Sequence, residues 1–193
     1  GMIASEYLPG DNLTWMGLFD RGELIMSQGR RRLEYVIPHV SPSGITGAPA
    51  ISETVSDPEL NRIGEAAVRA LDPEYHGVGF VDLKGDEAGV ARVTELNAGR
   101  FGTTHFFYSA AGANFPAALV QLAMGQRPDV PKRDALAAGL TWIRTLDAGP
   151  VLTTRAAIER GDYPQIGPGE TWPRIPQKMG EFPGHTLPWD PEP

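Results

Sequence analysis

The chain has 193 residues, of which 41% are hydrophobic and 21% charged, and its formal net charge is −7. This suffices for one domain with its own core, and the acidic balance argues against general binding to nucleic acid or an anionic membrane. Cysteine is absent, which excludes disulfides, zinc–thiolate sites and a cysteine nucleophile. No apolar run approaches the roughly 20 residues of a membrane helix, and no signal-peptide pattern opens the chain, so we expect a cytoplasmic protein.

Taken in chain order, the first predicted unit is a β-hairpin. An apolar run over residues 12–19, a turn at Asp20-Arg21-Gly22 and a second apolar run over 23–26 are typical of two paired strands. The strand region continues through Arg30, Arg31 and Arg32 until Pro38 ends it. Residues 41–52 are rich in Ser, Gly and Pro, which predicts a loop.

A helix is predicted next, because Asp57 is a good N-cap and Pro58 suits the first helical position. Apolar residues recur at helical spacing as far as Leu71. Residues 78–83 and 90–96 then predict two further strands joined by a turn. Asn114 can cap a helix over 115–124, and we expect a short helix near 132–138, a strand over 140–146 and a helix over 154–160.

Strand hairpins followed by helices indicate an α+β domain. Eight of the 18 prolines lie between Pro164 and Pro193, so the end of the chain is unsuited to regular structure. We predict a folded body of two parts, residues 3–125 and an α/β extension over 126–162, followed by a Pro-rich tail over 163–193. The tail either wraps over its own body or a neighbour, or is a free linker.

The most informative segment is the predicted hairpin between residues 77 and 104. If its strands pair antiparallel and the turn closes near residues 88–89, Asp82 lies opposite Glu95. Side chains alternate along a strand, so Glu95 and Asn97 share a face. We expect the same face to continue as an apolar surface made of Val78, Phe80, Ala91 and Val93.

Two carboxylates placed opposite each other destabilise a sheet, and burying them costs more unless they are paired or bound to metal. Mg²⁺ accepts carboxylate and amide oxygens and usually shares its coordination with substrate phosphates. The pattern therefore favours a magnesium site on Asp82, Glu95 and Asn97. Two alternatives stay open: an exposed hairpin end with solvated acids, and a register one residue off, which would turn Asp82 to the other face.

This hairpin resembles the metal-binding hairpin of the ATP-grasp superfamily, in which an acidic or amide residue on one strand is followed by Glu-x-Asn on the next. The large chain of carbamoyl phosphate synthase and its shorter relatives are the most similar members. The resemblance implies ATP and Mg²⁺ as cofactors, with Glu95 bridging two Mg²⁺, Asn97 binding one and Asp82 the other. It also implies the C-terminal subdomain of that fold over residues 3–125: an antiparallel sheet with helices packed on one side.

The same resemblance implies a hinge for adenine. Residues 5–10 look like the hinge whose backbone bonds the purine edge, with Glu6, Tyr7 and Leu8 in the contacting positions. The ribose position falls at Asn12, where the family usually has Glu. Without the resemblance, the segment reads equally as a turn that enters the first strand.

Residues 43–47 are similar to the Gly-rich loop that reaches the nucleotide in the carbamoyl phosphate synthase branch. Gly44, Ile45 and Thr46 hold the relevant positions, and Thr46 replaces the usual His. Backbone N–H groups of such a loop can cradle phosphate, although an ordinary connecting loop would look the same.

Arg100 would contact phosphate or a developing acyl phosphate, although one residue is inserted relative to the family's Asn-Pro-Arg. A salt bridge to one of the acids is the alternative. The family often has an Arg-rich strand where Arg30, Arg31 and Arg32 lie. Alternation sends Arg30 and Arg32 to one face and Arg31 to the other, facing either substrate or a solvated edge.

A complete ATP-grasp ligase also has an upstream domain and a lid with a phosphate-clamping Lys or Arg, whereas the first Lys here is Lys84. The resemblance therefore implies the ATP- and Mg²⁺-binding half of a ligase that activates a carboxylate as an acyl phosphate and joins it to an amine. We expect a separate chain with the upstream half, or a homodimer, and an isolated chain that is inactive. The alternative is a truncated, non-catalytic nucleotide-binding or scaffold module.

Overall fold

The computed structural model describes residues 4–41, 43–102, 105–144 and 151–160. The predicted Pro-rich tail over 163–193 lies outside the described residues. The division of the chain at residues 125 and 162 stays a prediction.

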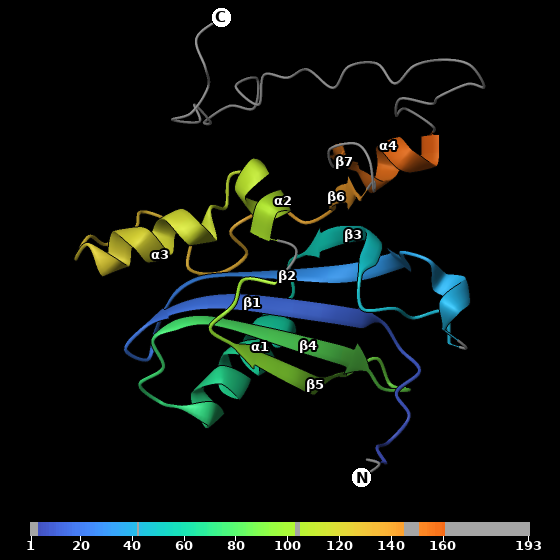
Figure 1. The fold of residues 1–193 in the computed structure, drawn as a ribbon, viewed down its shortest axis with the longest axis horizontal. Helices are drawn as coiled ribbons and strands as arrows, with labels where there is room; N and C mark the ends of the chain where they lie inside the picture. The colour runs from blue at the N-terminus through green and yellow to red at the C-terminus, as the bar shows by residue number, and fades with distance from the viewer. Residues whose placement is uncertain (1–3, 42, 103–104, 145–150, 161–193) are drawn as a thin grey trace, which may run out of the picture.

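One antiparallel sheet forms the centre of the molecule, with strand order β5-β4-β1-β2-β3-β6-β7 (Figure 1). The strands are β1 (Asn12–Asp20), β2 (Glu23–Tyr35), β3 (Pro49–Val55), β4 (Gly77–Gly85), β5 (Ala91–Ala98), β6 (Leu140–Ile143) and β7 (Val151–Thr154). The helices are η1 (Pro38–Val40), α1 (Pro58–Leu71), α2 (His105–Ala110), α3 (Phe115–Ala123) and α4 (Arg155–Arg160). This arrangement confirms the α+β class with an antiparallel sheet.

The first hairpin turns at the predicted place. Arg21 and Gly22 both have positive φ, 47° and 81°, as a tight two-residue turn between twisted strands requires. The strands it joins, β1 and β2, lie in the middle of the sheet, where both of their faces can be covered.

Alternating side chains of the central strands divide the core into two layers. Met16 and Leu18 belong to the cluster that includes α2 and α3, which we call the α2–α3 face. Trp15 and Phe19 belong to the cluster that includes α1, which we call the α1 face. Helices therefore lie on both sides of the sheet (Figure 1), where one side was expected, because β1 carries buried apolar residues on both of its faces.

Helix α1 begins as predicted. The Asp57 carboxylate accepts hydrogen bonds from the backbone N–H groups of Glu59 and Leu60, at 2.8 and 3.3 Å, and so caps the helix. The helix lies close to the sheet at Gly64, where an added Cβ would come within 2.3 Å of the Trp15 ring.

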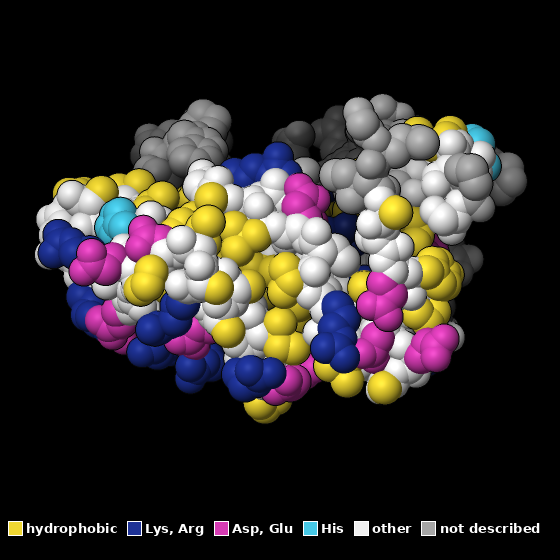
Figure 2. Space-filling view, turned by 90° about the horizontal axis from the view of Figure 1, so that it is seen from below, with side chains coloured by type: hydrophobic (Ala, Val, Ile, Leu, Met, Phe, Trp, Pro, Cys, Tyr) yellow, Lys and Arg dark blue, Asp and Glu magenta, His cyan; other side chains and the backbone are white. Residues whose placement is uncertain are grey.

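The outer surface of α1 carries both signs of charge. Arg62 pairs with Glu59, and Glu65 pairs with Arg69 and Arg133. In Figure 2, which views the molecule from below, basic and acidic side chains are interspersed around apolar patches. No helix among the described residues combines the length and apolar character needed to span a membrane.

Two local predictions were wrong. Residues 49–55 form β3, although composition predicted a loop over 41–52, because this segment pairs with both β2 and β6. Residues 132–138 form an irregular segment instead of a helix. That segment is bound to β2: the Ala135 N–H donates to the Ser27 carbonyl at 3.1 Å, and the Leu136 N–H to the Gln28 side chain at 2.8 Å.

Candidate functional site

The acidic hairpin has the predicted register. Asp82 of β4 lies opposite Glu95 of β5, and Phe80 lies opposite Asn97. Phe80 belongs to the α2–α3 cluster, so the side chains of Asp82, Glu95 and Asn97 share the α2–α3 face.

A bulge at Thr94 separates this polar end from the rest of the hairpin. Asp82 pairs with Glu95 but Leu83 pairs with Val93, so Thr94 is the extra residue. The expectation that Ala91 and Val93 extend the Phe80 face was therefore wrong, because a bulge reverses alternation. Ala91 packs instead in the α1 cluster.

A protein cation accompanies Asp82. The Arg32 guanidinium forms an ion pair with Asp82 Oδ1, and Thr14 Oγ1 donates to the same oxygen at 3.0 Å. Arg32 also donates to Thr14, from Nε at 3.2 Å and from Nη2 at 3.0 Å. Asp82 and Arg32 are 20% and 14% exposed, so Arg32 offsets much of the charge that a metal was expected to neutralise.

Glu95 and Asn97 fit a metal better than Asp82 does. Glu95 is exposed and Asn97 half-buried, and the Asn97 amide nitrogen is buried with no hydrogen-bond partner among the residues described. Their oxygens suit Mg²⁺ that takes its other ligands from phosphate or water. Among the described residues there is no group of three or more His, Cys, Asp or Glu side chains that could hold a metal.

A buried arginine lies on the same sheet face as Asp82, because both residues pair with Thr14 of β1. Arg30 of β2 is 1% exposed, and within the described part of the chain its Nε and Nη1 make no hydrogen bond. Its Cζ lies 5.7 Å from the centre of the Phe80 ring. Burial lowers the pKa of Arg30 to about 10, which leaves the guanidinium charged at neutral pH.

Asn12 lies on the same face as Asp82, since it pairs with Arg32 on one side and Lys84 on the other. Its side-chain oxygen accepts from Lys84 Nζ at 3.2 Å. Of the predicted hinge, Glu6 and Tyr7 are exposed and Leu8 is half-buried, in an irregular segment that leads into β1.

The predicted phosphate loop lies between η1 and β3 and uses its polar groups locally. The Gly44 N–H donates to the Ser41 carbonyl at 3.0 Å, and the Ile45 N–H to Ser43 Oγ at 3.3 Å. Thr46 Oγ1 donates to the Val36 carbonyl at 2.7 Å. In this arrangement neither N–H is available to a phosphate.

Arg100 is exposed and follows the turn at Gly99, whose φ is +77°. Within the described residues it forms no ion pair, so the alternative of a salt bridge to a hairpin acid is not seen. The structure therefore brings Asp82, Glu95, Asn97 and Asn12 to one sheet face, and leaves Arg100 beyond the end of β5.

The hydroxyls of Tyr35 and Ser52 also belong to this region, although the sequence did not point to them. Both oxygens are buried, and neither has a hydrogen-bond partner in the part of the chain that the structure describes. Ser52 lies in β3 opposite Arg32, and Tyr35 lies near Arg32, with the pKa of its hydroxyl raised by burial. Neither could be placed, because β3 was assigned to a loop and the register of β2 shifts after Arg32.

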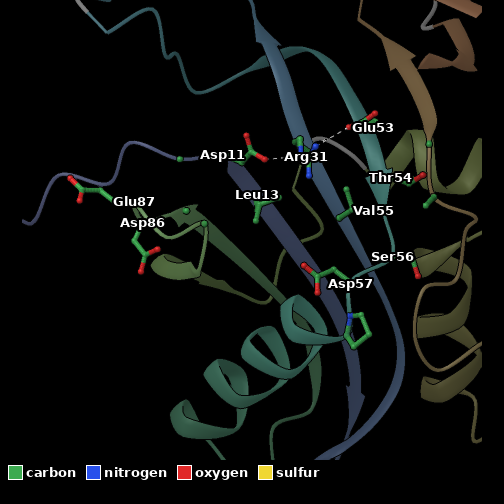
Figure 3. Close-up of a pocket in the computed structure, with 16 residues that line it drawn as sticks. Asp11, Leu13, Arg31, Glu53, Thr54, Val55, Ser56, Asp57, Asp86 and Glu87 are labelled. Atoms are coloured by element: carbon green, nitrogen blue, oxygen red, sulfur yellow. Dashed lines mark ion pairs between the residues drawn. The ribbon is translucent and has the colours of Figure 1, made fainter. Parts of the chain in front are cut away.

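A separate cleft of about 740 Å³ lies on the α1 face (Figure 3). Arg31 lies there between Asp11 and Glu53, with ion-pair distances of 3.1 and 3.6 Å. Asp57, the cap of α1, lines the same cleft. Strand alternation thus separates Arg31 from Arg30 and Arg32, as predicted.

No protein-family model matches the sequence, and no curated protein matches it. Solved structures do match. The biotin carboxylase domain of Hydrogenobacter thermophilus 2-oxoglutarate carboxylase, in complex with MgADP, ADP and bicarbonate, gives a TM-score of 0.50 at 16% identity, covering 71% of this chain and 30% of that one. Biotin carboxylase from Campylobacter jejuni gives 0.50 at 14% identity, covering 72% and 30%.

The ATPase subunit of phosphoribosylaminoimidazole carboxylase from Aquifex aeolicus also gives a TM-score of 0.50 at 14% identity, covering 72% of this chain and 41% of that one. These proteins are ATP-grasp enzymes. The similarity establishes that this chain has the fold of part of an ATP-grasp enzyme. The matched part of this chain spans about 30% of the length of the biotin carboxylase chains.

Proposed function

We propose that this chain supplies the ATP- and Mg²⁺-binding half of a ligase related to the large chain of carbamoyl phosphate synthase. The observation that carries the proposal is the placement of Glu95 and Asn97 on one sheet face beside Asp82. Carboxylate and amide oxygens suit Mg²⁺ and leave coordination positions for phosphates. The fold shared with a biotin carboxylase domain that holds MgADP supports the same assignment.

The nucleotide would lie along the end of the sheet where β1 begins. The backbone of Glu6, Tyr7 and Leu8 would hold the adenine edge, and Asn12 the ribose hydroxyls. Asn12 supports this placement because it shares the face of Asp82 and lies in the adjacent strand.

The loop at Gly44, Ile45 and Thr46 would close over the phosphates, and Arg100 would stabilise charge on the transferred group. Loop closure requires the local bonds of Gly44 and Ile45 to open. Arg100 is exposed and so is free to turn toward a bound nucleotide.

In the complete enzyme a carboxylate oxygen would attack the γ-phosphorus of ATP, the bond from that phosphorus to the bridging oxygen would break, and ADP would leave. An amine would then attack the acyl carbon, lose a proton and displace phosphate. Bound Mg²⁺ neutralises charge on the phosphate oxygens. Further cations must stabilise the transferred group, and we propose that a separate chain or a second copy provides them.

One observation favours a second candidate function, a non-catalytic nucleotide-binding or scaffold module. The Arg32–Asp82 pair offsets an acid that a two-metal ligase would need for metal. Such a module would bind nucleotide with one Mg²⁺ or none, and no partner chain would restore turnover.

Calorimetric titration of the chain with Mg²⁺-ATP tests the proposal. We expect micromolar binding that is lost in Glu95→Ala and Asn97→Ala, because these substitutions remove the oxygens that hold the metal. Glu87→Ala is the matched control, since Glu87 is an exposed acid in the turn of the same hairpin.

Absence of binding at millimolar nucleotide would overturn the proposed site, as would an equal loss in Glu87→Ala. ADP formation measured with and without the candidate partner chain separates the ligase from the non-catalytic module.

A further inference from the structure

The α2–α3 face holds several buried polar atoms that have no hydrogen-bond partner among the described residues. They are Arg30 Nε, Arg30 Nη1, Tyr35 Oη, Ser52 Oγ and Asn97 Nδ2. A buried polar group without a hydrogen-bond partner destabilises the fold, and a charged one does so more strongly. Native structures rarely retain such groups without a ligand, water or functional reason.

Three of these groups lie close together. Arg30 pairs with Thr54, and Arg32 pairs with Ser52, so Ser52 is the diagonal neighbour of Arg30 across β2 and β3. Diagonal neighbours on one face lie within reach of long side chains. Tyr35 lies near both arginines: burial raises the pKa of its hydroxyl, while the charges of Arg32 and Arg30 act to lower it.

Positive charge exceeds negative charge around Arg30. The ionisable groups that act on it are Tyr108, Arg32, Asp82 and Arg144. Asp82 is the one acid in this set, and it is already paired with Arg32. Arg30 therefore has no carboxylate of its own among these groups.

The aromatic ring beside Arg30 does not satisfy its hydrogen bonds. Phe80 meets the guanidinium carbon at 5.7 Å, which offers a cation–π attraction. The N–H groups of a guanidinium lie in its plane and need oxygen acceptors. An oxyanion is the ligand that suits these unpaired donors, because it accepts charge-assisted hydrogen bonds from a guanidinium.

We propose that Arg30, with the hydroxyls of Tyr35 and Ser52, binds a small oxyanion, a carboxylate or a phosphate group. Arg30, Thr14, Asp82 and Glu95 are paired in turn across β2, β1, β4 and β5, so the buried guanidinium lies in the same row as the exposed Glu95. The assignment of the bound anion as the carboxylate substrate rests on the proposed ligase function, whereas oxyanion binding itself does not.

Titration of the full chain with inorganic phosphate and, separately, acetate at constant ionic strength tests the proposal. Calorimetry and thermal unfolding are expected to show saturable binding and stabilisation. Arg30→Met should weaken binding about tenfold or more, because it removes the positive charge and its charge-assisted hydrogen bonding. Tighter binding of acetate identifies a carboxylate ligand, and tighter binding of phosphate a phosphoryl group.

Arg31→Met is the matched control, because Arg31 is the next residue of the strand and lies on the opposite face. It should leave anion binding unchanged. Tyr35→Phe and Ser52→Ala keep the charge and the fold, and each should weaken binding about threefold or more, as loss of one hydrogen bond does.

An equal loss in Arg31→Met, or no saturable binding by the unmodified chain, overturns the proposal. The two proposals fail separately. Anion binding that depends on Arg30 without any Mg²⁺-ATP binding rejects the ligase half and leaves the oxyanion site. Mg²⁺-ATP binding without anion binding rejects the oxyanion site and leaves the ligase half.

Discussion

At the scale of single residues, the site is defined by how charges are offset. We expected a metal to relieve the repulsion between Asp82 and Glu95, but Arg32 relieves it for Asp82. The alternation of the three arginines was predictable from the strand period. The partner of Arg32 was not, because it depends on the pairing of β1 with both β2 and β4.

The Arg32–Asp82 pair gives a residue-scale prediction. Arg32→Met should lower the free energy of unfolding by about 2 kcal/mol, because it leaves a partly buried carboxylate with one neutral donor. Urea denaturation measures the change. The double variant Arg32→Met with Asp82→Asn should recover part of the loss, and strict additivity of the two single changes would contradict a direct interaction.

At the scale of elements, the turn of the β4–β5 hairpin depends on one carboxylate. Asp86 accepts from the N–H of Val90 at 2.9 Å and of Ala88 at 3.0 Å, and from Arg92 Nε at 2.9 Å. These contacts lower the pKa of Asp86 below its usual value, and the hydrogen bond from the Val90 N–H is the largest cause. Because the folded pKa is lowered, the stabilisation is present above the unfolded pKa and is lost as pH falls through the folded one.

Asp86→Asn should therefore be less stable than the unmodified chain at neutral pH, and the difference should shrink below the ordinary aspartate pKa of about 3.9 and vanish below the lowered folded pKa of Asp86. Denaturation across a pH series measures it. A difference that persists unchanged in acid would contradict the charge-based account.

The contact between α1 and the sheet gives a second element-scale prediction. Gly64→Ala should destabilise the fold by about 1–3 kcal/mol, although alanine favours helix, because its Cβ would clash with Trp15. Thermal unfolding measures the loss. Gly47→Ala is the control, since its Cβ would meet nothing within 4 Å. Equal losses of stability in the two variants would rule out the clash with Trp15.

What the sequence predicts well at this scale is local. The turn at residues 20–22, the Asp57 cap and the Asp82–Glu95 register depend on neighbouring residues or one hairpin. Strand β3 and the bulge at Thr94 depend on pairing with other strands. The burial of Arg30 depends on Phe80, which lies fifty residues further along the chain.

At the scale of the whole molecule, one sheet presents two different surfaces. The α1 face holds a cleft with Arg31 among acids (Figure 3), and the α2–α3 face holds the hairpin acids beside Arg30. The shared ATP-grasp fold agrees with the sequence resemblance. The likeness to carbamoyl phosphate synthase stays a proposal, because the matched structures are those of other enzymes.

The central claim is that nucleotide binds at the end of the α2–α3 face. Amide NMR spectra of the chain titrated with Mg²⁺-ATP test this most directly. We predict shifts at Glu6–Leu8, Glu95 and Asn97, with Asp57 and Arg31 unchanged. Shifts confined to the cleft around Asp57 and Arg31, or no shifts at saturating nucleotide, would contradict the account.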